Sequence, residues 1–169
     1  PMPRTLAVAA ALTLAVSAAG AKTLVYCSEG SPENFTPALN TTGTSFDAAR
    51  PVYDKLTQFA RGSTVVEPGL AESWTVSPDS KVFTFKLRAG VKFQDGSPFN
   101  ADAVKFSFDR ARAADSTNKA KKTVFDNISS IATPQPDLVI LTLNNADATL
   151  PFRLGEGTAV ILSPTSAAT

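Results

Sequence analysis

The residue types that carry most protein chemistry are scarce in this chain. Its 169 residues include no histidine, which removes Ser-His-Asp and Cys-His catalysis and His-ligated zinc unless another chain supplies the imidazole. The only cysteine, Cys27, cannot form an internal disulfide, a CxxC redox pair or an iron–sulfur site. The sequence also has no Walker loop, GxSxG elbow or GxGxxG fingerprint. We therefore expect no cofactor and no enzymatic activity.

Two aspartates on one predicted helix, Asp102 and Asp109, come closest to a paired-carboxylate site. Seven residues of helix rise by about 10 Å, which is too far for a tightly coupled acid–base pair. We interpret Asp102 as a partner of the helix dipole in the first turn and Asp109 as a solvated charge. A net charge of +1 offers no electrostatic reason to expect nucleic acid as a partner.

The amino end has the pattern of a secretory signal peptide. Met2-Pro3-Arg4 supplies a short positive start, and the uncharged apolar run 6–16 is shorter than the roughly 20 residues of a membrane-spanning helix. Ala19-Gly20-Ala21 fits an A-x-A cleavage site. We predict a signal peptide over residues 1–21, cleaved after Ala21, and export to the periplasm. The alternative is a buried Ala/Leu helix of the domain.

Hydrophobic periodicity downstream of this leader predicts strands interleaved with helices. A short β-prone run at 23–26 precedes a loop rich in proline and turn-forming residues. Apolar residues at steps of three and four over 46–59 indicate a helix, in which Pro51 is tolerated only in the first turn. Residues 65–70 should form an extended edge with a turn.

The clearest local pattern is a hairpin. Residues 73–76 and 81–88 are β-prone and flank a turn at 77–80. Because side chains alternate along a strand, three apolar residues of the second strand should share one face: Phe83, Phe85 and Leu87.

A capped helix and a second hairpin follow. Asn100 should cap the helix, which buries a stripe at i, i+4 and i+7 formed by Val104, Phe108 and Ala111. The second hairpin joins 127–132 to 138–143, and Asn145 should then cap a short helix over 146–154. Strands and helices alternate without a repeating βαβ period, so we predict an α+β or mixed α/β fold.

Three spaced stretches resemble the signature of family 5 extracellular solute-binding proteins, the periplasmic peptide-binding receptors of ABC importers. They are PGLAESW (68–74), FTFKLRAGVKF (83–93) and DGSPFNADAV (95–104). The segment TLVYCSEGSPENFTPAL (23–39) is similar to the dipeptide-binding branch in particular. The resemblance covers essentially the whole mature chain.

This resemblance implies a periplasmic-binding-protein type II-like fold, with two lobes around a peptide cleft and an extra domain inserted in lobe one. Family members are considerably longer than this chain. By resemblance, residues 22–42 are the first strand and loop of lobe one, 43–163 are the inserted α+β domain, and 164–169 are a truncated re-entry into lobe one. We therefore expect an amino-terminal fragment that lacks the second lobe.

The function that the resemblance implies is capture of short peptides, with dipeptides favoured, for delivery to an ABC permease in the inner membrane. We expect a monomer that binds its solute without chemistry. Two alternatives stay open. One is a receptor of the same family for another solute, such as haem, a nickel chelate, glutathione or an opine. The other is a periplasmic chaperone-like protein or enzyme that uses the same fold.

Two sets of residues follow from the resemblance as candidates. The loop after the first strand lines the cleft in that family, which maps ligand binding onto Thr41, Thr42 and Gly43. Glycine allows close backbone approach and a threonine hydroxyl donates or accepts, although an ordinary polar loop would also contain these residues. Cys27 is either a buried small hydrophobe or, as in the dipeptide-binding branch, a disulfide partner of a cysteine beyond Thr169. For an exported protein we favour the disulfide.

Overall fold

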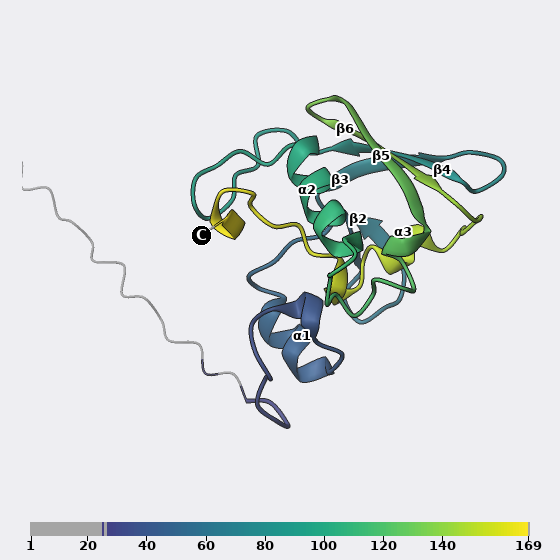
Figure 1. Cartoon of the computed structure of the whole chain (residues 1–169). Coiled ribbons are helices and arrows are strands. Elements are labelled where there is room, and N and C mark those ends of the chain that lie inside the picture. Colours follow the sequence, from purple (N-terminus) through teal and green to yellow (C-terminus); the bar gives the residue numbers. More distant parts are fainter. Residues whose placement is uncertain (1–24, 26, 169) are drawn as a thin grey trace, which may run out of the picture.

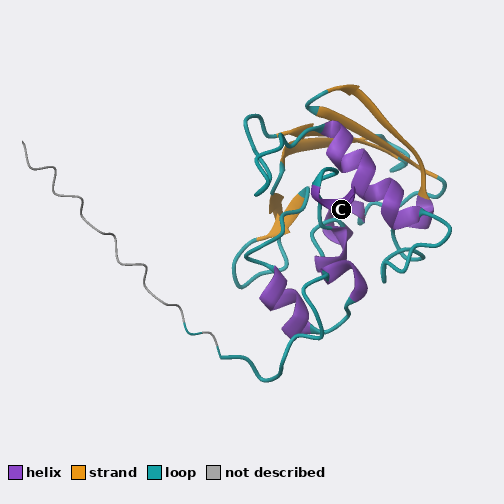
Figure 2. Cartoon of the chain, turned by 60° about the vertical axis from the view of Figure 1, so that its left-hand side comes forward, coloured by secondary structure: helices purple, strands orange, loops and turns teal. Residues whose placement is uncertain are grey.

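A computed structural model describes Val25 and residues 27–168. The predicted signal peptide and most of the predicted first strand lie outside these residues. A four-stranded sheet with one long helix on its inner face forms one side, and short helices and loops form the other (Figures 1 and 2). Among the described residues, no helix is long and apolar enough to cross a membrane.

The sheet consists of two antiparallel hairpins joined side by side. Its strands lie in the order β3-β4-β6-β5, and they are β3 (Ala71–Val76), β4 (Val82–Leu87), β5 (Ile128–Gln135) and β6 (Leu138–Leu143). Phe85 of β4 lies opposite Trp74 on one side and Val139 on the other. Both predicted hairpins are therefore confirmed, and the central pair β4–β6 brings them together.

The inner face of the sheet is the main part of the core. The three apolar residues predicted to share a face of β4 are buried, whereas Val82 and Thr84, which alternate with them, are only half-buried and Lys86 is exposed. The helix α2 (Ala101–Arg112) packs against this inner face, as Figure 2 shows. The mixed α+β class expected from the sequence is confirmed.

The cap and stripe predicted for α2 are also present. The side-chain oxygen of Asn100 accepts a hydrogen bond from the backbone N–H of Ala103 at 3.0 Å, which satisfies one of the free donors of the first turn. All three stripe residues are buried. Asp102 lies in the first turn as expected. Asp109, in contrast, is not a solvated charge, because it pairs with Lys105 at 2.5 Å and Arg112 at 2.7 Å.

The helix predicted over 46–59 is wrong. The structure has a shorter helix, α1 (Gly43–Ala49), then a turn and a two-stranded ribbon of β1 (Thr57–Phe59) and β2 (Val66–Pro68). The helix ends ahead of Pro51, which has no N–H to continue the ladder. The ribbon confirms the extended edge predicted at 65–70.

The helix expected over 146–154 is also shorter than predicted. It is α3 (Leu150–Arg153), and Asn145 does not cap it. The backbone N–H and C=O of Asn145 are instead bonded to the side-chain amide of Asn127, each at 2.9 Å. Four 3-10 turns complete the described elements: η1 (Pro37–Leu39), η2 (Phe125–Asn127), η3 (Gly157–Ala159) and η4 (Ser166–Ala168).

Candidate functional site

Two cavities of similar size lie on the side away from the sheet. We call them the Thr41 cavity, of about 550 Å³, and the Asp95 cavity, of about 580 Å³. Tyr53 and Asp54, in the segment between α1 and β1, line both of them. The chain forms a turn after Ala49 where a longer helix was predicted, and this turn places the two side chains between the cavities.

The structure separates the three residues predicted to bind ligand. Only Thr41 lines the Thr41 cavity, where it is exposed. The hydroxyl of Thr42 donates to the Ser45 hydroxyl at 2.9 Å within the first turn of α1. Gly43 is the first residue of α1, and a Cβ added there would meet nothing within 4 Å. Close approach of another group therefore does not require glycine at this position in the described chain.

The loop that carries Thr41 is held from behind by a buried amide. Asn40 is 1% exposed, and its side chain and that of Asn34 bond each other in both directions at 3.1 Å. The amide of Asn40 also donates to the carbonyl of Thr36 at 3.2 Å. One turn further back, the carbonyl of Ala38 accepts from the backbone N–H of Lys119 at 2.9 Å. Thr41 thus projects from a fixed loop.

The rim of the Thr41 cavity carries more positive than negative side chains. Arg50, Lys55 and Lys119 line it together with Asp54 and Glu156. Burial, followed by the neighbouring Arg50 guanidinium, lowers the pKa of the Lys55 ammonium, and Asp54 opposes this shift. The rim is therefore suited to polar or anionic groups of a ligand.

One glycine is required on the wall of this cavity. A Cβ on Gly157 would lie 2.3 Å from Cδ1 of the Phe46 ring, well inside contact distance. Gly157, the first residue of η3, thus lets the Phe46 ring of α1 pack against the backbone at this point. The wall is shaped by this contact rather than by regular secondary structure.

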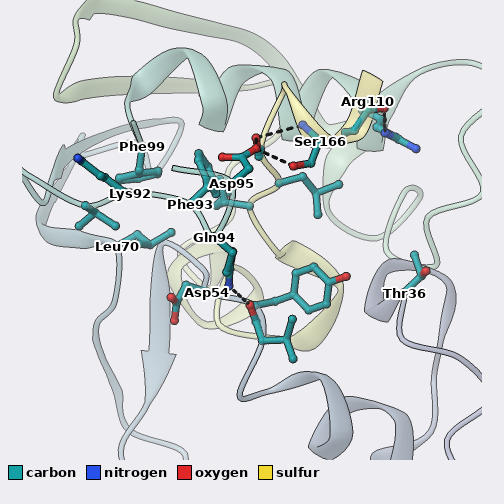
Figure 3. A pocket seen from close by; sticks show the side chains of 17 residues that line it. Thr36, Asp54, Leu70, Lys92, Phe93, Gln94, Asp95, Phe99, Arg110 and Ser166 are labelled. Carbon is teal, nitrogen blue, oxygen red and sulfur yellow. Dashed lines mark hydrogen bonds between the residues drawn. The ribbon is translucent and has the colours of Figure 1, made fainter. Parts of the chain in front are cut away.

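The Asp95 cavity has an apolar floor and a polar rim. Leu70, Phe93 and Phe99 project into it, and Lys92, Asp95 and Arg110 lie around its edge (Figure 3). Gln94 donates from its side-chain amide to the carbonyl of Val52 at 3.0 Å, which ties the loop after β4 to the segment after α1. Residues 161–167 form another wall of the cavity.

The Asp95 carboxylate accepts four hydrogen bonds. Its Oδ1 accepts from the backbone N–H and the hydroxyl of Ser97, at 2.8 and 2.5 Å. Its Oδ2 accepts from the hydroxyl of Ser163 at 2.5 Å and from that of Ser166 at 2.6 Å. Figure 3 shows Asp95 beside Ser166. These donors, the Ser163 hydroxyl first, lower the pKa of Asp95 far below its ordinary value. Ser163 and Ser166 could not be inferred from the sequence as partners of Asp95, because they lie 68 and 71 residues away along the chain.

Cys27 lies apart from both cavities. Its thiol is free and exposed in the described chain, and burial of Cys27 in the longer protein stays a prediction. The disulfide with a cysteine beyond Thr169 stays a prediction. Within the residues that the structure describes, no group of three or more His, Cys, Asp or Glu side chains is placed to hold a metal ion. Hydroxyl, amide and charged side chains line both cavities.

This chain is similar to known solute-binding proteins. Residues 65–168 match the model of the middle part of bacterial extracellular solute-binding proteins, family 5. A di/tripeptide-binding protein of Pseudomonas aeruginosa is 48% identical over 156 residues, which cover 82% of this chain and 29% of that protein. The dipeptide-binding protein of Escherichia coli is 55% identical over 111 residues, or 62% of this chain and 21% of that protein.

A solved structure agrees with these sequence matches. It is a dipeptide-binding protein of Pseudoalteromonas in complex with Met-Leu, 31% identical to this chain with a TM-score of 0.76. The match covers 86% of this chain and 32% of that one, so the chain spans about a third or less of the relatives it matches. The match of the family model to more than half of the residues, on a fold shared with a solved relative, shows that this chain belongs to the family 5 bacterial extracellular solute-binding proteins.

Proposed function

We propose that this chain is part of a periplasmic receptor that captures short peptides, dipeptides above all, for an ABC importer. The observation that carries the proposal is the shared fold with a relative whose structure contains Met-Leu. The di/tripeptide-binding relatives support the same solute class over most of this chain.

Capture requires binding without chemistry. Hydroxyl and backbone groups would satisfy the polar atoms of the peptide, and roomy pockets would tolerate varied side chains. In this chain Thr41 would make such a contact, and its position on the wall of a cavity with a polar rim supports this. In the longer protein, closure of two lobes about a hinge would bury the peptide and form the surface that meets the permease.

The division of the chain rests on the same proposal. Residues 22–42 would belong to lobe one, 43–163 to an inserted domain and 164–169 to a return into lobe one. The start of α1 at Gly43 coincides with the first boundary, and the residues just before it, such as Asn40, are already packed against the unit. Export to the periplasm would follow from the signal peptide predicted over residues 1–21, with cleavage after Ala21.

Calorimetry on the longer protein that would contain this chain tests the proposal. Dipeptides and tripeptides should give saturable heat, and glutathione and haem serve as the competing solutes. The absence of heat with every peptide would refute the proposal. Saturable heat with haem or glutathione alone would favour a receptor for another solute. Suppression of aggregation with no saturable site would favour a chaperone-like protein.

A further inference from the structure

The segment 161–167, which we call the strap, runs along one wall of the Asp95 cavity and is anchored unevenly along its length. In Figure 1 the yellow end of the chain lies beside the teal loop that follows β4. The strap contributes five residues to the lining of the cavity, which are Ile161, Leu162, Ser163, Ser166 and Ala167. Its position therefore decides whether that cavity is closed on this side.

The first two residues of the strap are held through their backbone. The N–H of Ile161 donates to the carbonyl of Asp54 at 3.0 Å, and the N–H of Leu162 donates to the Ser107 hydroxyl at 2.9 Å. Ser107 is buried in α2, and its hydroxyl in turn donates to the Ala103 carbonyl at 2.8 Å. Buried backbone donors are costly to leave without a partner, so this end of the strap is firmly fixed.

The rest of the strap is held mainly by side chains, and of these Ser163 is buried whereas Ser166 is exposed at the rim. The Ser163 hydroxyl also lies 3.2 Å from the hydroxyl of Ser97. The hydroxyls of Ser163 and Ser166 share one carboxylate oxygen of Asp95, and Arg110 reaches the carbonyl of Ala167 only at 3.5 Å. Asp95 and Ser166 are exposed, so water can replace the contact between them when it breaks. Pro164 follows Ser163 and has no N–H with which to anchor the backbone at that point.

We propose that residues 163–167 open and close this wall of the Asp95 cavity, with Ser163 as the pivot and the Asp95 carboxylate as the catch. The two carboxylate oxygens of Asp95 bond different segments of the chain. Oδ1 shapes the turn from Asp95 to Ser97, and Oδ2 holds only the strap. Opening would expose the apolar floor that contains Leu70, Phe93 and Phe99. This device is independent of which solute the protein binds.

Hydrogen exchange on the 169-residue chain tests the proposal with Asp95→Asn. Asparagine keeps a carbonyl oxygen for the turn, but it replaces the charged acceptor of the two strap hydroxyls with an amide. Exchange of the amides of Ser166 and Ala167, which are bonded to Ser163 in the closed strap, should accelerate about tenfold. The amides of Ile161 and Leu162 should keep their protection.

The matched control is Asp79→Asn. Asp79 is likewise an exposed turn aspartate bonded to a serine hydroxyl, that of Ser77, and it is not part of the Asp95 cavity. It should leave exchange in the strap unchanged. Unchanged exchange at Ser166 and Ala167 in Asp95→Asn would overturn the proposal, as would equal acceleration of Ile161 and Leu162.

A second variant covers the case in which Asp95→Asn does not fold. Ser163→Ala removes a strap donor and leaves the bonds between Asp95 and Ser97 intact. Because the Ser163 hydroxyl is itself the acceptor for the Ser166 amide, the amide to follow in this variant is that of Ala167, which is bonded to the Ser163 carbonyl. Its exchange should accelerate, and the fluorescence of anilinonaphthalene sulfonate, which reports exposed apolar surface, should increase. If neither measurement changes, the proposal that the Asp95 carboxylate holds the strap closed is refuted.

Discussion

The sheet layer and the cavity side of this molecule are stabilised by different kinds of contact. In the sheet layer, buried apolar side chains repeat at regular spacing, and Phe83 and Phe85 of β4 are completely buried. On the cavity side, single polar groups join segments far apart in sequence, as the buried hydroxyl of Thr57 does with the carbonyl of Pro151 at 2.6 Å. The sheet layer is stabilised by the apolar surface area that it buries. The shape of the cavity side is set by individual hydrogen bonds between distant segments.

The largest effect that this comparison predicts is in the sheet. Phe85→Ala removes a fully buried ring between Trp74 and Val139 and should lower the free energy of unfolding by about 3–5 kcal/mol, measured by urea denaturation. Phe35→Ala is the control, since its ring is 63% exposed, and it should change stability by less than about 0.5 kcal/mol. Equal losses in the two variants would contradict the division into two regions.

On the cavity side, a pair of glycines provides the sharper test. Gly157→Ala forces a methyl group against the Phe46 ring and should cost about 1–3 kcal/mol of unfolding free energy. Gly43→Ala, at the start of α1 where a Cβ has open space, should change stability by less than about 0.5 kcal/mol. Thermal melts of both variants measure the difference, and a neutral Gly157→Ala would show that the wall repacks freely.

The third prediction concerns ligand binding at the Thr41 cavity. In the longer protein proposed to contain this chain, Thr41→Trp should fill part of the cavity and weaken dipeptide affinity about tenfold by calorimetry. Thr117→Trp serves as the control, because this exposed threonine does not line the Thr41 cavity. If both variants bind dipeptide like the unchanged protein, Thr41 is not a ligand contact.

The smallest expected effect is the response of the strap to acid. Hydrogen bonds lower the pKa of Asp95 in the folded protein, so the stabilisation from its charge is present above the ordinary aspartate pKa of about 4. It is lost only as the pH falls through the lowered value. Strap exchange corrected for intrinsic rate should therefore be the same at pH 7 and pH 4. The other charged side chains that line this cavity are those of Lys92, Arg110 and Asp54. Markedly faster strap exchange at pH 4 would show that the Asp95 carboxylate titrates with the ordinary aspartate pKa.

Local pattern predicted the sheet layer well for a physical reason. Alternation in β4, the Asn100 cap and the stripe on α2 depend on residues two to four positions apart, so the sequence shows them directly. The lengths predicted for α1 and α3 were wrong because a proline or a contact between residues farther apart determined where each helix lies. Pro51 limited α1 to seven residues, and the bonds between Asn127 and Asn145 occupied the backbone that a longer α3 would have used.

The sequence by itself determined the α+β class, both hairpins, the cap of α2 and the resemblance to family 5 solute-binding proteins. It also suggested Thr41 as a ligand contact, which stays a prediction. Only the tertiary structure decided that Thr41 lines a cavity while Thr42 and Gly43 do not, and that Asp95 binds Ser163 and Ser166. The reason is distance along the chain, because a pairing across 68 or 71 residues leaves no periodicity or cap signal and exists only once the segments have packed together.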